Sequence, residues 1–279
     1  MHASRRNLDL IKFEHTIFAM PFALISLLVA TGGRPPGRLL LWVVVAMVAA
    51  RSAAMAFNRL ADRRLDAANP RTADRHLPAG TVPVAGAAVL VAGSAAVFVL
   101  AARMLNPLCF ALSPVALAVV LGYSYLKRVT PLAHLGLGLG LAIAPVGAWL
   151  AAQGAFAPFP LWLGAGVMYW VAGFDTFSGI QAVDFGRRAG LHGPAARWGG
   201  ARALTVPRLC HLLAVAAVAG AVRRADVLGT VSLLGVVVMA GLLAWEQAIV
   251  RGGDMRRIDK AFFVINSWIG VVLLAVVAL

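Results

Sequence analysis

Nine long apolar segments, separated by short stretches rich in proline, glycine or charge, most limit how this chain can fold. About 20 mostly apolar residues cross the hydrocarbon of a bilayer as a helix, which satisfies its backbone hydrogen bonds internally. The pattern therefore predicts an all-α membrane protein with nine transmembrane helices. The expected spans are residues 16–32, 39–57, 82–103, 107–124, 131–151, 159–179, 204–221, 227–248 and 261–278.

The composition excludes an ordinary soluble protein. Of the 279 residues, 61% are hydrophobic and 13% are charged, whereas soluble domains carry about 25% charged residues. Mean hydropathy is +0.85. We therefore expect residues 1–279 to form a single integral membrane domain surrounded by the lipid bilayer. No feature of the sequence indicates an oligomeric state.

The net charge of +14 comes from basic residues in the short connections between apolar segments. No basic stretch has the length of a domain, so we expect no nucleic-acid partner. Twenty of the 25 Lys and Arg residues lie at the N-terminus or in the connections after the second, fourth, sixth and eighth spans. The positive-inside rule then places these parts in the cytoplasm and the C-terminus outside, in the cell inner membrane. No cleavable signal peptide is visible, so the first span should remain as an anchor.

Three polar residues at the end of the second span are the strongest candidates for chemistry. Asn58, Asp62 and Asp66 follow at intervals of four and so share one face of a helix. An amide and two carboxylates offer the hard oxygen ligands that Mg²⁺ prefers, and carboxylates beside a membrane span are costly unless they serve a function. The alternative is a solvated helix end whose acids pair with the arginines beside them: Arg59, Arg63 and Arg64.

Two further arginines follow this helix. The helix should end near Asn69-Pro70, because the residue before a proline is pushed out of the helical conformation, and Arg71 and Arg75 come next. The arginine fork donates two hydrogen bonds to a phosphate. Acids that hold a cation, followed by arginines that hold an anion, suit a metal–diphosphate headgroup.

These motifs resemble the UbiA family of intramembrane aromatic prenyltransferases, in the bacterial branch of 4-hydroxybenzoate and menaquinone-pathway enzymes. The family's N-x-x-x-D-x-x-x-D motif is intact at Asn58, Asp62 and Asp66, and its Y-x-x-x-K motif is present at Tyr123 and Lys127. Four further stretches match: IKFEHTIFAMPFALIS at 11–26, NPRTADRHLPAG at 69–80, LGLGLAIAPVGAWLA at 137–151, and the pattern from Ala261 to Asn266.

The resemblance implies helices around a central cavity that opens sideways to lipid, and a Mg²⁺-dependent transfer of a polyprenyl group. The donor would be a polyprenyl diphosphate. The acceptor would be an aromatic acid, 4-hydroxybenzoate or a naphthoate, in ubiquinone or menaquinone biosynthesis. Asn58, Asp62 and Asp66 would hold the metal, and Asp62, Asp66 and Asp175 are the expected catalytic residues. The expected substrate-binding residues are Arg71, Tyr123, Lys127, Arg128, Asp184 and Arg187.

Two of these assignments have plainer alternatives. Lys127 and Arg128 follow a span and could simply anchor it by the positive-inside rule. Asp175 could orient or deprotonate a phenolic acceptor, or it could face water at a span end.

The second acidic motif of the family is where this chain departs. Related sequences carry a pattern like D-x-x-Y-A-x-Q-D-x-x-x-D, in which Asp175 and Gln181 match. Ala182 and Gly186 stand where the two metal-binding acids would be, and Ser178 replaces the tyrosine.

Three interpretations of this departure are open. Asp184, with Asp175, supplies a rearranged metal contact. Alternatively, the enzyme works with one Mg²⁺ and leaves Lys127, Arg187 and Arg188 to neutralise the diphosphate. In the third, the protein is a catalytically impaired relative that binds a prenyl diphosphate or a quinone precursor. A transporter would need a paired internal repeat, and none is visible.

The remaining polar and glycine residues are expected to have structural rather than catalytic roles. The lone loop histidines His76 and His192 are expected to be structural or solvated, and His134 and His211 are expected to be interface residues rather than ligands. Cys109 and Cys210 lie in apolar contexts and are expected to be inert. The glycine-rich run at 136–140 is expected to allow close helix packing rather than phosphate binding.

Overall fold

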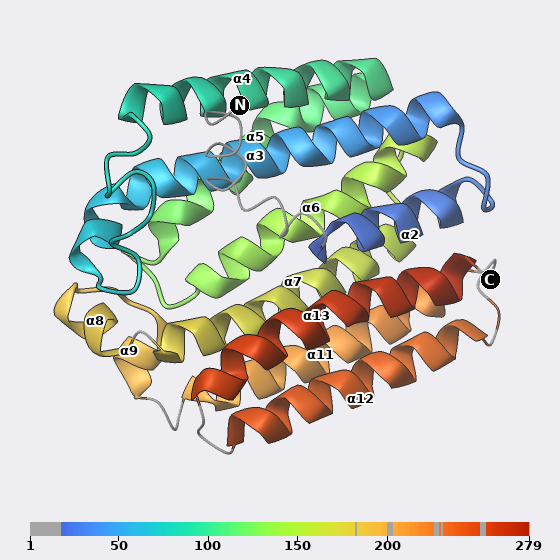
Figure 1. The fold of residues 1–279 in the computed structure, drawn as a ribbon. Helices are drawn as coiled ribbons and strands as arrows, with labels where there is room; N and C mark the ends of the chain where they lie inside the picture. The colour runs from blue at the N-terminus through green and yellow to red at the C-terminus, as the bar shows by residue number, and fades with distance from the viewer. Residues whose placement is uncertain are drawn as a thin grey trace.

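The computed structural model describes residues 18–278, apart from 182, 200–202, 226–228, 230 and 252–254. The described residues form helices joined by short connections, without a strand, which confirms the predicted all-α fold (Figure 1). The longer helices are α2 (Met20–Ala30), α3 (Gly37–Ala68), α4 (Val84–Leu105), α5 (Pro107–Leu126), α6 (Ala133–Gln153), α7 (Pro158–Gln181), α11 (Thr205–Val222), α12 (Val231–Arg251) and α13 (Met255–Ala278). Two short helices, α8 (Val183–Arg188) and α9 (Pro194–Trp198), lie between α7 and α11.

Local sequence signals set several of the helix ends. Asn106 caps α5 by accepting a hydrogen bond from the Cys109 backbone N–H at 2.8 Å, and Pro107 follows in the first turn, where its missing N–H costs nothing. Asn69, before Pro70, is extended and ends α3, as predicted. Gly154 ends α6 with φ +66, a conformation that few residues other than glycine adopt readily.

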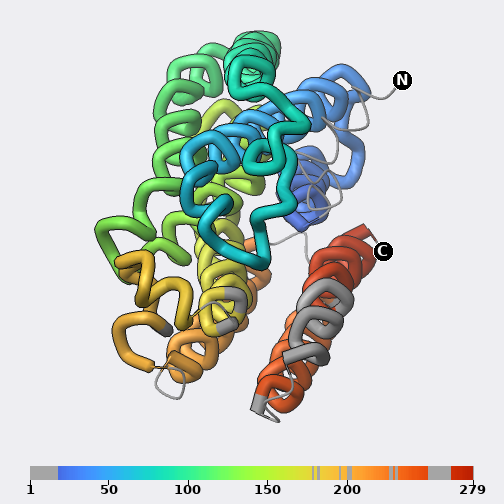
Figure 2. Tube along the Cα trace, turned by 60° about the vertical axis from the view of Figure 1, so that its left-hand side comes forward, coloured from blue at the N-terminus to red at the C-terminus, as the bar shows by residue number. Residues whose placement is uncertain are grey.

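The helices form two groups that meet at α7. The helices α3, α4, α5 and α6 pack against one another on one side, and α11, α12 and α13 lie on the other (Figures 1 and 2). The central helix, α7, contacts α6 and α11 most extensively. Its buried Trp170 packs against Phe22 of α2, with ring centroids 5.2 Å apart, and donates a 2.7 Å hydrogen bond to the Asn266 side chain of α13.

Six helices are long and apolar enough to cross a membrane by length and composition: α3, α4, α5, α6, α11 and α12. Two shorter apolar stretches, Met20–Ala30 and Ile265–Ala278, lie within the described residues. Each of the nine predicted spans overlaps one of the longer helices. The fold class and its several crossings are therefore confirmed, whereas the count of nine crossings stays a prediction.

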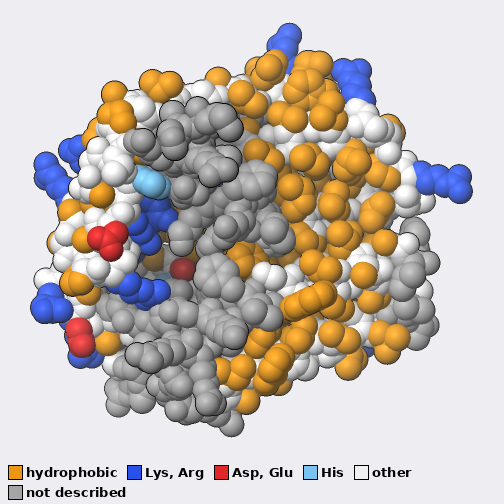
Figure 3. Space-filling view, in the orientation of Figure 1, with side chains coloured by type: hydrophobic (Ala, Val, Ile, Leu, Met, Phe, Trp, Pro, Cys, Tyr) orange, Lys and Arg blue, Asp and Glu red, His pale blue; other side chains and the backbone are white. Residues whose placement is uncertain are grey.

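The connections gather at two ends of the bundle. The segment between α3 and α4, the α5–α6 connection, α8 and α9 lie at one end, on the left of Figure 1. Charged side chains gather at this end in Figure 3, whereas hydrophobic side chains cover much of the middle of the same face. Some Lys and Arg side chains also lie at the opposite end. The charged side chains at one end fit the prediction that most Lys and Arg residues lie in alternate connections on one side of the membrane. Which end faces the cytoplasm stays a prediction.

The predicted close packing of the glycine-rich run occurs at Gly138. A Cβ on this residue would lie 2.2 Å from the Met168 carbonyl oxygen of α7. Only hydrogen therefore fits between the two backbones, and α6 and α7 cross at very short range. This crossing sets the geometry of the adjoining site.

Candidate active site

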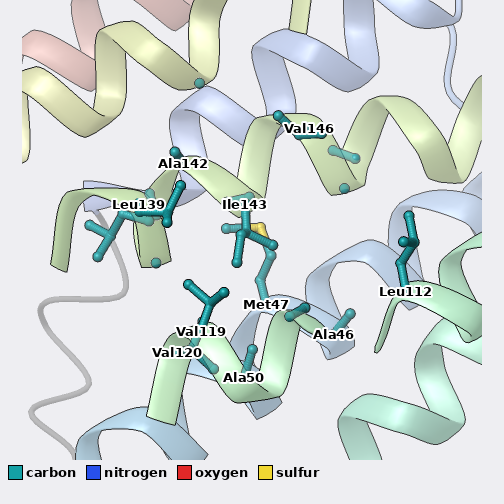
Figure 4. Close-up of a pocket in the computed structure, with 18 of the residues that line it drawn as sticks. Ala46, Met47, Ala50, Leu112, Val119, Val120, Leu139, Ala142, Ile143 and Val146 are labelled. Carbon is teal, nitrogen blue, oxygen red and sulfur yellow. The ribbon is translucent and has the colours of Figure 1, made fainter. Parts of the chain in front are cut away.

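A cavity of about 570 Å³ lies among α3, α4, α5, α6 and α7 (Figure 4). Its wall is almost wholly aliphatic, with Met47 from α3, Val120 from α5 and Ile143 from α6 among its lining residues. Val115, at the same cavity, is 60% exposed. The cavity therefore reaches the apolar outer surface of the bundle, and its lining suits a hydrocarbon chain.

The cavity has a polar end formed by Arg51 of α3 and Tyr123 of α5. Arg51 lies seven residues before Asn58, and Tyr123 lies four before Lys127, so each shares a helix face with a predicted site residue. The Tyr123 phenol is within electrostatic range of Arg51 and Arg59 and of Asp62 and Asp175. The apolar cavity therefore leads into the predicted acidic site.

Asp62 lies at the centre of this site and is 2% exposed. Its Oδ2 is paired with the Lys127 ammonium and accepts a 3.1 Å hydrogen bond from the Asn58 amide. Its Oδ1 lies 3.2 Å from Nη2 of Arg128, which also donates to the Ala61 carbonyl oxygen. Two cations from the end of α5 thus converge on one buried carboxylate of α3.

Asp66, one turn further along α3, is 7% exposed and has its own cations. Its Oδ1 accepts a 2.7 Å hydrogen bond from Nη1 of Arg75, while Nη1 of Arg59 lies 3.9 Å from Oδ2. Within the described part of the chain, Oδ2 is buried and has no hydrogen-bond partner. Thr72 donates a hydrogen bond to the Asp66 carbonyl oxygen at 3.0 Å, which fixes the chain leading to Arg75.

These contacts contradict the interpretation of a solvated helix end. Both acids are buried, and their main partners come from later segments of the chain. Arg63 and Arg64 are exposed. Only Arg59, among the three neighbouring arginines proposed as partners, has a described approach to either acid, and that approach is long.

The same face satisfies part of what a Mg²⁺ ion requires. Asn58, Asp62 and Asp66 place amide and carboxylate oxygens along one side of α3, and Oδ2 of Asp66, which accepts no hydrogen bond from the described residues, offers a buried oxygen for a hard cation. No cluster of three or more His, Cys, Asp or Glu side chains that could enclose a metal occurs among the described residues. The donors therefore fit an ion that takes its remaining ligands from a substrate or water.

The facing wall, at the end of α7, carries Asp175. Its Oδ2 lies 2.6 Å from Nδ1 of His134, in the first turn of α6. Asp175 thus does not merely face water; the structure ties it to a second helix.

Several other predicted residues of this end are exposed. Asp184 and Arg187, on α8, are exposed, and Nε of Arg187 donates to the Ala196 carbonyl oxygen at 3.1 Å. Gly186 is buried, whereas Ala182 and the side chains of Ser178 and Gln181 lie outside the described residues. Arg71 is exposed, and its backbone N–H is bonded to Asn69 at 3.1 Å.

Three residues with a place in this site were not singled out from the sequence. Arg51 was counted only as a basic flanking residue, although its spacing of seven from Asn58 could have identified it. Oγ of Ser124 accepts a 3.4 Å hydrogen bond from the Asn58 amide. No motif or spacing in the sequence links these two residues. His134 was expected to be an interface residue, and no spacing links it with Asp175, 41 residues later.

The structure agrees with the non-catalytic interpretations of His211 and of the two cysteines. His211 is buried between α7, α11 and α12, where a Cβ on Gly173 would lie 2.4 Å from its Nε2 and Gln247 lies 3.0 Å from its Nδ1. Cys109 and Cys210 are free cysteines, as expected.

Comparisons with known proteins place this arrangement in context. The model of the UbiA prenyltransferase family matches residues 19–268. A 4-hydroxybenzoate octaprenyltransferase from Nitrosospira multiformis is 33% identical over 259 residues, which cover 91% of this chain and 87% of that protein. A protein of the same name from Alkalilimnicola ehrlichii is 32% identical over 250 residues, with coverages of 88% and 83%.

Solved structures agree with these relatives. The apo structure of a UbiA homolog from Aeropyrum pernix K1 is 34% identical, covers 94% of this chain and 96% of its own, and superposes with a TM-score of 0.86. A UbiA homolog from Archaeoglobus fulgidus bound to DMAPP and Mg²⁺ shares the fold at a TM-score of 0.72 and 17% identity. Together with the family match over most of the sequence, they show that this multi-pass membrane protein belongs to the UbiA prenyltransferase family.

Proposed function

We propose that this protein transfers a polyprenyl group from a polyprenyl diphosphate to an aromatic acid, 4-hydroxybenzoate or a naphthoate, in ubiquinone or menaquinone biosynthesis. One observation carries the proposal: a cavity with an aliphatic wall has a polar end that leads to the buried Asn58, Asp62 and Asp66 face. A donor with a long hydrocarbon tail and a charged head needs this combination. The names of the relatives support the same reaction.

The donor's tail lies in the cavity, and its diphosphate lies against α3 and the end of α5. Asn58, Asp62 and Asp66 are the residues that would hold Mg²⁺, and a bound ion would supply positive charge against the diphosphate leaving group. The Archaeoglobus structure, solved with DMAPP and Mg²⁺, supports this cofactor. Asp62 and Asp66 act in catalysis by placing this charge at the leaving group.

Basic side chains complete the diphosphate site. Lys127 and Arg128 already converge on Asp62, so their positive charges lie where a diphosphate beside that carboxylate would be. Tyr123, one turn before Lys127, offers a hydroxyl at the boundary between tail and headgroup. We assign Arg71 and Arg187 to the outer part of the same anion, because both are exposed at this end of the bundle. Asp184, exposed on α8, would meet the substrate only at this outer edge.

The acceptor's two polar groups have partners on opposite walls. Arg51 borders the apolar cavity, and its buried Nε has no hydrogen-bond partner among the described residues. An unpaired buried guanidinium N–H favours an anionic ligand, and the acceptor's carboxylate supplies one. Asp175 takes the phenolic hydroxyl.

The reaction then follows from these positions. The C–O bond between the prenyl group and diphosphate breaks, and the diphosphate leaves with the electron pair. The allylic carbon bonds to the ring carbon beside the hydroxyl, and one proton is released overall. The aliphatic wall keeps water from the allylic cation, which water would otherwise capture.

Two finer features belong to this proposal. The site faces the cytoplasm, as does the N-terminus, with the C-terminus outside and the chain in the inner membrane, which the distribution of Lys and Arg supports. Residues 1–279 act as one domain. The relatives bear the name of a transferase and lend no support to a catalytically impaired protein.

A direct assay tests the proposal. Membranes that contain the protein are incubated with radiolabelled polyprenyl diphosphate, Mg²⁺ and either 4-hydroxybenzoate or 1,4-dihydroxy-2-naphthoate. A prenylated aromatic product that disappears on chelation of the metal is expected. A folded protein that forms no product with any acceptor would refute the proposal.

The acceptor site has its own prediction. Arg51→Met should raise the KM for the aromatic acid about 10–100-fold, because a charged hydrogen bond to a carboxylate contributes about 1.5–3 kcal/mol. The KM for the donor should change little. Arg38→Met is the matched control, since Arg38 is exposed near the other end of the same helix. An equal rise in both KM values would argue against the carboxylate assignment.

A further inference from the structure

We propose that His134 is a positioning residue that holds Asp175 in the orientation needed to take the acceptor's phenolic proton. This inference rests on the proposed function and deepens it by assigning a role to a residue on the wall opposite the acids of α3. The bond between His134 and Asp175 joins α6 to α7, with Asp175 within electrostatic range of Tyr123 at the polar end of the cavity.

Both residues continue helix faces that line the cavity. Leu161, Ala165 and Met168 of α7 line it, and Asp175 lies seven residues beyond Met168, on the same face. Leu137 and Leu141 of α6 line it too, and His134 lies three residues before Leu137. The two side chains thus extend the α6 and α7 walls beyond the apolar cavity.

The close crossing at Gly138 accounts for their contact. Gly138 lies one turn from His134, and its partner Met168 lies two turns from Asp175. Because the two backbones almost touch there, the short side chains of an aspartate and a histidine can span the gap between the helices beyond it. A residue larger than glycine at the crossing would move them apart.

The surroundings of His134 fix one ring orientation. Its side chain is 15% exposed, and that of Asp175 is 30% exposed. The edge of the ring that carries Nε2 is packed beneath Gly179 and Gly193: a Cβ on Gly179 would lie 3.4 Å from Nε2, and one on Gly193 would lie 3.9 Å away. Nδ1 therefore faces Asp175, and we place a ring proton on Nδ1, from which it is donated to Oδ2.

Among the described residues, His134 contacts Oδ2 of Asp175 and not Oδ1. Oδ2 accepts from His134, so Oδ1 remains to accept the proton of the phenol. As that proton moves to Oδ1, the ring carbon bonds to the prenyl carbon and the diphosphate departs. The resulting dienone regains aromaticity when its ring carbon loses a proton and its oxygen gains one. His134 exchanges no proton with the substrate and acts only through Asp175.

Three variants separate this role from a purely structural tie between helices. His134→Ala should lower kcat about 10–100-fold, since a small misplacement of a reacting group can cost about 100-fold, and should leave the KM for the donor near the wild-type value. His134→Asn should restore most of the rate, because its amide N–H can replace Nδ1–H. His134→Gln, whose amide lies one bond further out, should not.

A double-mutant cycle and a modified acceptor sharpen the test. His134→Ala should add little to the defect of Asp175→Ala, because His134 acts through that carboxylate. With 3-fluoro-4-hydroxybenzoate, whose phenol ionises more readily, the defects of both single variants should shrink. If His134 were only structural, the rate losses of His134→Ala and Asp175→Ala would add in the double variant. They would also be equal for 4-hydroxybenzoate and its 3-fluoro derivative.

The control is His192→Ala. The His192 side chain is exposed, and its residue holds the Lys127 carbonyl oxygen through the backbone N–H at 3.0 Å, so the rate should stay near wild type. The inference is overturned if His134→Ala, folded as judged by its melting temperature in detergent, turns over at the wild-type rate, or if Asn and Gln rescue equally. An inactive wild type overturns the proposed function instead, which separates the two failures.

Discussion

The wall formed by α3 and α5 and the wall formed by α7 differ in how deeply their acids are buried and in which residues pair with them. On the α3 and α5 wall, Asp62 and Asp66 are buried, and cations from other segments surround them. On the α7 wall, Asp175 is half-exposed and bonded to a histidine, while Asp184 of the adjoining α8 is exposed.

The difference shows where an ionic ligand can bind. Buried acids with cationic partners fit the site that we propose for a metal and an anionic substrate group, because positive and negative charges are compensated there. A single carboxylate held by an imidazole is suited to accepting a hydrogen bond or a proton. In the proposed reaction, the wall of α3 and α5 binds the leaving group, and the wall of α7, where Ala182 and Gly186 depart from the family pattern, binds the acceptor.

The largest expected effect comes from removing charge on the acidic wall. Asp62→Ala should lower transferase activity about 100–1000-fold, the loss typical of removing one preorganised electrostatic contact to a transition state. The fold should survive, because Lys127 and Arg128 are about one third exposed and can turn to water. Rates with saturating substrates and Mg²⁺ titrations measure the effect.

Asp74→Ala is the matched control for this variant. Asp74 is an exposed acid in the connection that follows α3, so its loss should leave the rate within about twofold. If Asp62→Ala kept full activity, the metal assignment on α3 would be wrong.

The next effect breaks the geometry of the facing wall. Gly138→Ala places a Cβ 2.2 Å from the Met168 carbonyl oxygen, so α6 and α7 must separate. We expect a loss of about 1–3 kcal/mol in stability, as for other overpacked sites, together with a reduced rate. Thermal unfolding in detergent and turnover of the same preparation measure both.

Gly93→Ala, on α4, serves as its control. A Cβ there meets nothing within 4 Å, and alanine favours a helix over glycine by about 1 kcal/mol. The variant should be as stable as the wild type or slightly more so. A Gly138→Ala protein with unchanged melting temperature and rate would show that the crossing tolerates separation.

The smallest effect is a gain on the wall where Ala182 and Gly186 stand in place of the family's acids. Ala182→Asp together with Gly186→Asp should lower the Mg²⁺ concentration for half-maximal activity about 2–10-fold, because the second carboxylate pair restores hard ligands at the positions where the family carries its second pair of acids. At Gly186 a Cβ would lie 3.7 Å from the nearest side-chain atom, so a short side chain can be placed.

Ala189→Asp controls for added charge at the same end. An unchanged Mg²⁺ dependence of the double variant would mean that the α7 and α8 wall does not face the metal. A wild type without activity and a double variant with activity would instead support the catalytically impaired protein.

Much of this architecture could be predicted from the sequence. The apolar segments predicted the helices, Asn69-Pro70 predicted the end of α3, and the spacing of four placed Asn58, Asp62 and Asp66 on one face. These are local properties: a span depends on its own hydropathy, and a helix face depends on the 3.6-residue repeat.

The partners of these residues could not be predicted in the same way. Arg63 and Arg64 are nearest to the acids along the chain, but they point to the surface, and Lys127, Arg128 and Arg75 compensate the charge instead. Which cation reaches a buried carboxylate depends on how helices pack, and packing joins residues far apart in sequence.

The sequence by itself determined that the chain is a bundle of membrane helices with an acidic face at the end of α3 and a family motif around it. Only the tertiary structure decided that the acids are buried, that Arg51 borders the cavity, and that His134 holds Asp175. The reason is that a hydropathy pattern acts within one helix, whereas the crossing of α6 and α7 at Gly138 brings together residues 41 positions apart.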